Sequence, residues 1–326
     1  MSEKIYDLAI IGGGSAGVMG ALRGVLNNDE TILFPGSGKD KKRSRAMWVT
    51  KVENMPGHLE YKKGIENPNK ESLDWLATEC DLKEKFHWKK NRGITALTKE
   101  GELFTLTDNK GDVYQSRYVI ICTGVMDVQA KIQGEMAPFF PYANNQSIDY
   151  CLRCDGHHVY NQRTGIIGHG NGAGWVAAML HERYNTPAMK IFTNGEKPEF
   201  DDEVKGLIKK YGIEVFEGAI LSVDGDKKTG ELRAFEIEGT GPVEIDISFV
   251  SLGMIVYNEL AKSLGAEVDA RGFVLTNEKG ETNIDKLYVA GDLRAGMKKQ
   301  IYTAWDTSVD SADDVNARIR RVKRNS

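Results

Sequence analysis

Residues 150–158 read YCLRCDGHH and bring several chemically capable side chains together. Two cysteines stand two residues apart, an aspartate follows the second, and two histidines come next. Thiolates and imidazoles bind zinc, close thiols form disulfides, and a thiolate can exchange with the disulfide of another protein. This stretch alone therefore leaves a metal site, a structural bridge and a redox dithiol open.

A zinc site is the weakest of these alternatives. Structural zinc usually takes four ligands, and Cys151, Cys154 and one of His157 or His158 would supply three. The other cysteines, Cys80 and Cys122, fall in segments typical of regular structure, an amphipathic helix over 71–86 and a strand over 116–124. We therefore predict no metal, two packing cysteines, and histidines that are loop residues without a role.

Bulk composition excludes several classes of protein. The 326 residues are 40% hydrophobic, which is enough to fill a large core. The formal charge of −4 gives no sign of a nucleic-acid binder. The N-terminus does not resemble a signal peptide, and no apolar stretch is long enough to span a bilayer. We expect a cytoplasmic protein with no nucleic-acid or membrane partner. In the reducing cytoplasm, a close cysteine pair is more often catalytic or metal-binding than structural.

Two glycine-rich loops indicate dinucleotide binding. The apolar run 5–11 leads into GGGSAG at 12–17 and then into an apolar helix, the context that a dinucleotide fingerprint requires. Gly12 would make the tight turn, Gly14 would admit the pyrophosphate, and Gly17 would let helix and strand pack closely. A second copy, TGIIGHGNGAG, ends at Gly174 and is also followed by a helix.

Two further strands suggest how the chain is organised. One ends at Thr123 and Gly124, and the other ends at Gly291 and Asp292, where an acid can bond a ribose or ribityl hydroxyl. We predict an α/β protein with two nested, Rossmann-like, three-layer domains. The first comprises 1–125 and 253–326, and the inserted domain, 126–252, carries the two close cysteines.

Six motifs together carry a family resemblance. GGGSAG, KVENMPG (51–57), YVIICTG, CLRCDG, TNIDKLYVAGD and KQIYTA occur in the order found in thioredoxin reductases of the small, bacterial type. The resemblance covers nearly the whole chain. It implies that the first domain binds FAD, that the inserted domain carries a redox dithiol and, in ordinary members, NADPH, and that the protein is a homodimer.

The resemblance also assigns residues. Cys151 and Cys154 match the redox pair, and Asp155 matches the neighbouring acid, which would protonate a leaving thiolate. The FAD site would comprise Gly12, Gly14, Ser15, Ala16, Gly17, Thr50, Asn54, Thr123, Gly124, Gly291, Asp292, Gln300 and Ile301. The substrate would be the disulfide of a thioredoxin-like protein.

The sequence departs from the family at the coenzyme site. NADPH-using members carry a His-Arg-Arg run where this chain reads KIFTNGEKPEF at 190–200, without His or Arg. Large aromatic residues, Trp175 and Trp305, stand where we expect the nicotinamide channel and the flavin pocket. NADPH is therefore an unlikely donor, and in this respect the chain resembles ferredoxin-dependent flavin thioredoxin reductases.

Several donors remain open at this point. Ferredoxin is small and acidic, and the basic run 39–45 could dock it. A second FAD, as in diflavin-linked disulfide oxidoreductases, would suit Trp48, Trp175 and Trp305. The alternatives are an NADH- or NADPH-dependent reductase with an altered coenzyme site, and a flavoprotein redox sensor that is not an enzyme.

Overall fold

The computed structural model describes residues 4–38, 45, 49–61 and 63–325. They form two compact units. The first unit consists of residues 1–51, 60–126 and 256–326, and the second of residues 52–59 and 127–255. Most of the second unit is thus an insertion into the chain of the first, but the short segment 52–59 also belongs to it.

A seven-stranded sheet forms the centre of the first unit. Six of its strands run in the order β3-β2-β1-β6-β5-β4. The seventh, β17, pairs with residues 119–121 of β6, beyond the part of β6 that pairs with β5. The bounds are β1 Ile5–Ile11, β2 Thr31–Phe34, β3 Phe86–Trp88, β4 Ile94–Glu100, β5 Leu103–Asp108, β6 Val113–Ile121 and β17 Leu287–Val289. The strands β1, β2, β3, β6 and β17 are parallel, so their carboxyl ends meet at one edge, where ligands of such sheets bind.

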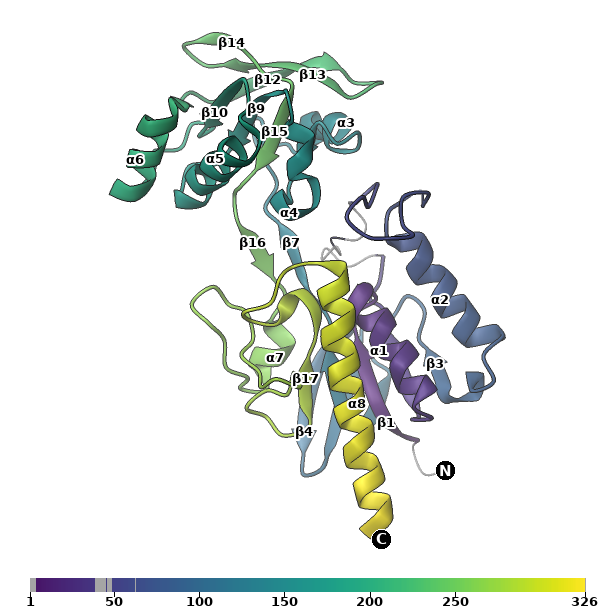
Figure 1. Ribbon diagram of the computed structural model, residues 1–326. Helices are drawn as coiled ribbons and strands as arrows, with labels where there is room; N and C mark the ends of the chain where they lie inside the picture. The colour runs from purple at the N-terminus through teal and green to yellow at the C-terminus, as the bar shows by residue number, and fades with distance from the viewer. Residues whose placement is uncertain (1–3, 39–44, 46–48, 62, 326) are drawn as a thin grey trace. The chain divides into compact units, whose positions relative to one another are not determined.

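Alternation along β1 separates the two faces of this sheet. Leu8 and Ile10 join the core beneath the helices 15–26, 66–78 and 301–325, whereas Ala9 and Ile11 join the core on the opposite face. The helices of this unit are α1 Ser15–Leu26, α2 Glu66–Thr78, α7 Glu259–Ser263 and α8 Ile301–Asn325, with short 3-10 helices η2 Lys83–Lys85 and η5 Gly291–Leu293. Figure 1 shows α1 and α8 side by side.

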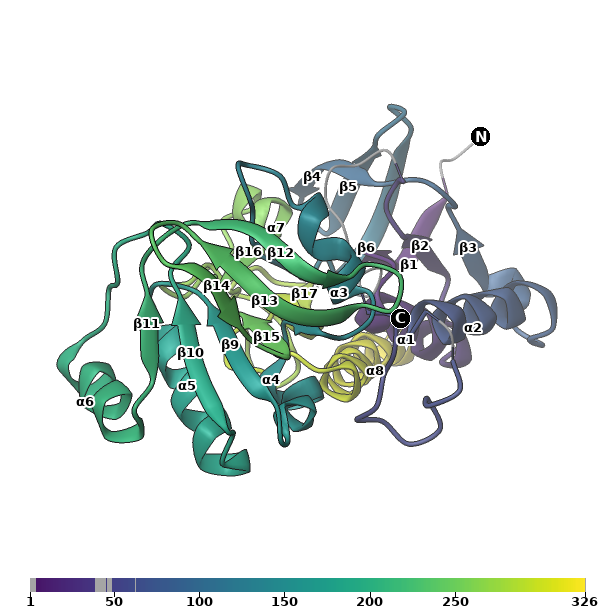
Figure 2. The ribbon, with the colours of Figure 1, turned by 90° about the horizontal axis from the view of Figure 1, so that it is seen from above.

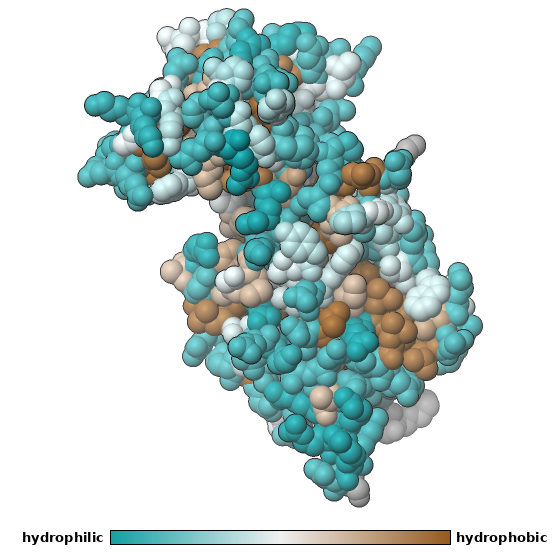
Figure 3. Space-filling view, viewed as in Figure 1, coloured by the Kyte–Doolittle hydropathy of each residue, from teal (hydrophilic) through white to brown (hydrophobic). Residues whose placement is uncertain are grey.

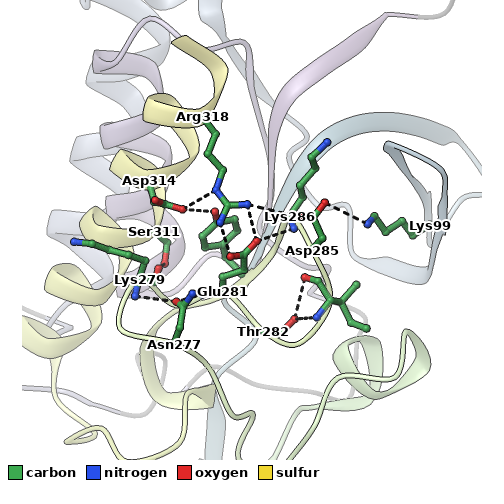
Figure 4. A network of polar contacts seen from close by, with 12 residues as sticks. Lys99, Asn277, Lys279, Glu281, Thr282, Asp285, Lys286, Ser311, Asp314 and Arg318 are labelled. Atoms are coloured by element: carbon green, nitrogen blue, oxygen red, sulfur yellow. Dashed lines mark hydrogen bonds and ion pairs between the residues drawn. The ribbon is translucent and has the colours of Figure 1, made fainter. Parts of the chain in front are cut away.

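Polar contacts hold the long helix α8 in place. Arg318 bonds to Glu281 and to Asp314, and Ser311 donates to the carbonyl of Lys279, so the loop before β17 is tied to the helix (Figure 4). At the amino-terminal end, the Ser308 hydroxyl donates to the Ala16 carbonyl at 2.7 Å. The start of α8 is thereby fixed beside the first glycine-rich loop.

The helix expected over 71–86 has different bounds. Helix α2 begins at Glu66 and ends at Thr78. The backbone N–H groups of Glu79 and Cys80 both reach the Trp75 carbonyl, at 2.9 and 3.0 Å, which closes the last turn. Cys80 then lies in the core beyond the helix, so the apolar periodicity continued past the real helix end.

The second unit is a three-layer sandwich. Its parallel sheet has the order β11-β10-β9-β15-β8, and an antiparallel meander, β12-β13-β14, lies over one face (Figure 2). Helix α5 packs on the other face through Ala173, Ala177 and Leu180. The strands are β8 Ile148–Asp149, β9 Arg163–Ile167, β10 Ala188–Phe192, β11 Glu214–Phe216, β12 Ile220–Asp226, β13 Glu231–Ile237, β14 Gly241–Glu244 and β15 Ile247–Val250.

The remaining elements are short or peripheral. The helices of the second unit are η3 Ala137–Phe139, α3 Phe140–Ala143, α4 Leu152–Asp155, η4 Gly156–Val159, α5 Asn171–Tyr184 and α6 Asp202–Tyr211. Where the chain leaves and re-enters the first unit, β7 (Val125–Asp127) and β16 (Met254–Val256) pair with each other. The two nested Rossmann-like domains predicted from the glycine loops are confirmed as a fold.

On the face of the molecule in Figure 3, hydrophilic residues predominate, and hydrophobic residues form smaller patches among them. Within the described part of the chain, no helix is both long and apolar enough to cross a membrane.

Candidate active site

The two close cysteines form a disulfide at the start of a helix. Cys151 is the N-cap of α4, and its sulfur accepts the backbone N–H of Cys154 at 3.2 Å. The α-carbons lie 5.2 Å apart and the sulfurs are bonded. Both residues are partly exposed, so a partner could reach this disulfide. A backbone N–H aimed at Cys151 stabilises a thiolate there once the bond is reduced.

Asp155 lies beside this disulfide. One of its carboxylate oxygens and both sulfurs lie within 4.8 Å of one another. At that range a proton can pass between the carboxylate and a sulfur through a single water molecule. The structure therefore brings together the three residues that the sequence predicted for thiol chemistry, Cys151, Cys154 and Asp155.

The sequence prediction missed a charged cluster next to the dithiol. One oxygen of Glu53 lies 2.7 Å from Nε2 of His157 and 3.0 Å from Nε2 of His158. The other ring nitrogen of His158 lies 2.8 Å from the carboxylate of Asp149, at the end of β8. Both histidines are therefore paired with acids, contacts that the sequence prediction of loop residues did not include.

Electrostatics in this cluster favour a charged His158. Its hydrogen bond to Asp149 is the main cause that raises its pKa, to about 9, with Glu53 adding to the effect and burial opposing it. Burial raises the pKa of Asp149, while its bond to His158 opposes that rise. The raised pKa therefore keeps His158 protonated at neutral pH.

The first glycine-rich loop fits a pyrophosphate group. Gly12 has a φ of +121°, and a Cβ there would lie 2.2 Å from the Cys122 carbonyl oxygen. A Cβ on Gly17 would lie 1.9 Å from the carbonyl oxygen of Gly12. Helix α1 starts after Gly14 with no side-chain cap and no acid in its first turn, which includes Ser15. Its N–H groups and positive end therefore suit an anion.

Other predicted FAD residues lie in the same unit. Gly124 has a φ of +65°, and the Thr123 hydroxyl donates to the Tyr257 carbonyl at 2.6 Å. Asp292 lies in η5 and faces the Arg45 guanidinium at 3.3 Å. The remaining predicted positions of this group are Gly291, whose Cβ would lie 2.8 Å from Cβ of Ala16, buried Gln300, and Ile301 at the start of α8.

Thr50 and Asn54 fall in different units. Thr50 is exposed and belongs to the first unit, whereas Asn54 lies in segment 52–59 of the second. Their predicted contact with a flavin stays a prediction. The basic run 39–44 and Trp48 lie outside the described residues.

The second glycine-rich loop carries an acidic neighbour. The Glu199 N–H donates to the His169 carbonyl at 2.7 Å, which brings residues 199–201 onto the loop. The Asn171 amide, in the first residue of α5, donates to Asp201 at 2.6 Å and accepts from the Asp201 N–H at 2.8 Å. The carboxylate of Asp201 therefore lies beside the first residue of α5.

The residues after β10 have other partners. The Thr193 hydroxyl donates to the Glu217 carbonyl, and Asn194 joins the Lys131 carbonyl to the Ile220 N–H. Trp175 is 38% exposed on α5, and Trp305 is partly buried on α8. These positions supply no guanidinium to a 2′-phosphate.

Fold and site define an enzyme class, a two-domain, dinucleotide-binding oxidoreductase with a redox disulfide. A family model for pyridine nucleotide-disulphide oxidoreductases matches residues 6–312, so the chain belongs to that family. It is therefore a flavin-dependent disulfide oxidoreductase.

Relatives and solved structures agree with this class. The chain is 26% identical to a thioredoxin reductase of Mycoplasma pneumoniae over 93% of this chain and 91% of that protein. It is also 26% identical to a thioredoxin reductase of Listeria monocytogenes, over 93% of this chain and 90% of that protein. The thioredoxin reductase of Streptococcus pyogenes superposes with a TM-score of 0.81, at 18% identity, over 98% of this chain and 100% of that one. A putative thioredoxin reductase of Bacillus anthracis superposes with a TM-score of 0.80, at 19% identity, over 98% of this chain and 99% of that one. At these identities the structures establish the fold.

Proposed function

We propose that this chain reduces the disulfide of a thioredoxin-like protein through Cys151 and Cys154, using FAD in the first unit and a donor other than NADPH. The exposed disulfide beside Asp155 supports the dithiol chemistry. Relatives named thioredoxin reductase over nearly their whole length support the substrate class.

The first unit would hold FAD by its own residues. The N-terminus of α1 and the loop from Gly12 to Gly17 would bind the pyrophosphate, and Asp292 would accept a hydroxyl of the ribityl chain. When bound, FAD supplies the electron pair that, with two protons, opens the Cys151–Cys154 bond. Gln300 and Ile301, at the start of α8, would help to hold the flavin ring.

The dithiol then passes the electron pair on. A thiolate of the pair attacks the partner's disulfide, forming one mixed S–S bond and releasing one partner thiolate. Asp155 protonates that leaving thiolate, and the second cysteine attacks the mixed bond. Cys151–Cys154 re-forms and the partner leaves as a dithiol, so the electrons balance.

The residues around the second glycine-rich loop are the reason for proposing a donor other than NADPH. Asp201 beside the first residue of α5 repels a pyrophosphate, and the stretch 190–200 has no arginine for a 2′-phosphate. Losing such charge pairs costs roughly 2–5 kcal/mol of coenzyme binding. A one-electron carrier such as ferredoxin needs neither contact and is the favoured donor. A second FAD remains the other candidate.

One observation favours a second candidate function, disulfide reduction with NADH or NADPH as the donor at an altered coenzyme site. Gly168 still allows close backbone approach, since a Cβ there would lie 2.5 Å from the Ser251 carbonyl oxygen. The glycine geometry of a dinucleotide loop is therefore present, and NADH lacks the 2′-phosphate.

Anaerobic titration of the purified flavoprotein decides between these donors. We expect the flavin absorbance to stay unchanged with NADPH or NADH and to bleach with reduced ferredoxin or dithionite. Rapid bleaching by either nucleotide would refute the donor proposal. Counting flavins per chain separates one FAD from two, and gel filtration with light scattering tests the expected homodimer.

A further inference from the structure

The cluster formed by Glu53, His157 and His158 has the donor set of a divalent metal site. Its three ligand atoms, two imidazole nitrogens and one carboxylate oxygen, lie within 4.8 Å of one another. All three residues belong to the second unit, and Glu53 comes from a segment distant in sequence. Zinc sites that keep an open position commonly take three protein ligands of this kind.

Asp149 orients the imidazole of His158. Its carboxylate accepts from Nδ1 at 2.8 Å, which leaves Nε2 as the nitrogen aimed at Glu53. A carboxylate behind a histidine in this way fixes the ring and strengthens it as a metal ligand. Asp149 is only 5% exposed and ends a strand of the parallel sheet, so this support is rigid.

A single carboxylate oxygen of Glu53 faces both imidazoles. Both Nε2 atoms face the same oxygen of Glu53, at 2.7 and 3.0 Å, and that oxygen can only accept. A hydrogen on each ring satisfies this arrangement. A divalent ion bound to the three atoms would take the place of these hydrogens, so metal binding and ring protonation compete at this position.

The spacing and exposure suit a small ion. Ligands of tetrahedral zinc, each about 2.0–2.1 Å from the ion, stand about 3.4 Å apart, so the side chains would separate by a few tenths of an ångström. The His157 side chain is 51% exposed, which gives an ion access from solvent. Two imidazoles and one carboxylate favour zinc among the abundant divalent ions over magnesium or calcium.

We infer that Glu53, His157 and His158 bind one Zn²⁺ or similar borderline divalent ion, with Asp149 as the positioning residue behind His158. The ion would join segment 52–59 to the segment that carries the dithiol. This site uses no thiolate, so it differs from a zinc site built on Cys151 and Cys154.

Calorimetric titration of the oxidised full-length flavoprotein with zinc sulfate tests the inference. We expect one saturable ion per chain while the disulfide is intact. Glu53→Gln and His158→Ala should abolish that binding, and Asp149→Asn should weaken it 10- to 100-fold. His181→Ala, on α5 and hydrogen-bonded to Thr186, is the matched control and should bind like the wild type.

X-ray absorption at the zinc edge gives an independent readout that does not depend on variant folding. A first shell of nitrogen and oxygen alone supports the inference. Sulfur in that shell would overturn it in favour of the cysteines, and so would zinc binding unchanged by Glu53→Gln. Absence of saturable binding to the wild type would show that the histidines form ion pairs only.

Discussion

At the scale of single residues, the dithiol carries the chemistry and the other cysteines do not. Cys154→Ser removes the resolving partner of Cys151, so disulfide reduction should fall at least a thousandfold, while flavin reduction by dithionite stays intact. Turnover of a thioredoxin-like disulfide measures the effect. Substantial activity in this variant would exclude the proposed exchange and favour a redox sensor.

Cys122 provides the contrast to this pair. It is buried below the first glycine-rich loop, and burial raises the pKa of its thiol to about 12. After reduction of the native protein at pH 8, iodoacetamide should therefore modify the Cys151–Cys154 pair and leave Cys122 unmodified. Peptide mass spectrometry locates the label, and fast labelling of Cys122 would contradict its buried position.

Asp29 makes the stability of the first unit depend on pH. Burial raises the pKa of this carboxyl to about 6, against a bond from Asn316 that lowers it. A raised folded-state pKa means that the stabilising proton is fully bound below about pH 4 and lost as the pH rises through 6. The wild type should therefore lose stability between pH 4 and pH 7, whereas Asp29→Asn, which cannot titrate at this position, should not. The free energy of unfolding of the variant, relative to that of the wild type, should be roughly 1–3 kcal/mol higher at pH 7 than at pH 4. Urea unfolding at both values checks this, and an equal difference at both would contradict it.

At the scale of elements, residues 199–201 connect two helices. Asp201 caps α6 by accepting the Val204 N–H at 2.8 Å and also bonds to Asn171 at the start of α5. Asp201→Ala should cost about 1–2 kcal/mol of stability, because a cap is lost. Asp202→Ala, at an exposed neighbouring acid, is the matched control and should change stability by less than about 0.5 kcal/mol.

The same aspartate also tests coenzyme exclusion. Asp201→Ser keeps a capping oxygen but removes the charge beside α5. If that charge repels a pyrophosphate, NADH should bind the variant more tightly than the wild type. Equal affinities, measured by calorimetry, would mean that the missing arginines alone account for any loss of coenzyme binding.

Local patterns predicted the elements better than the contacts between them. The glycine loops and the predicted strands before Thr123 and Gly291 indicated the nested fold, because each signal lies within a short continuous stretch of sequence. Glu53 and His157 are 104 residues apart, so no periodicity could connect them. The closure of 199–201 over the second loop depends on tertiary hydrogen bonds that leave no mark in the sequence.

At the scale of the whole molecule, two units with separate cores should respond differently to cofactor loss. The apolar cluster beneath α1 shares no residues with the clusters around β9. The predicted FAD residues of the loop before α1 and of the start of α8 belong to the first unit. A ligand present at a thousand times its dissociation constant stabilises only the unit that binds it, by about 4 kcal/mol.

Calorimetry of the flavin-free and reconstituted protein should therefore show two transitions. Removing FAD should lower one transition and leave the other in place, and adding FAD back should restore the first. Reducing the Cys151–Cys154 bond should instead move the transition that FAD leaves unchanged, because that disulfide belongs to the second unit. A single transition that shifts as a whole in both experiments would mean that the two cores unfold together.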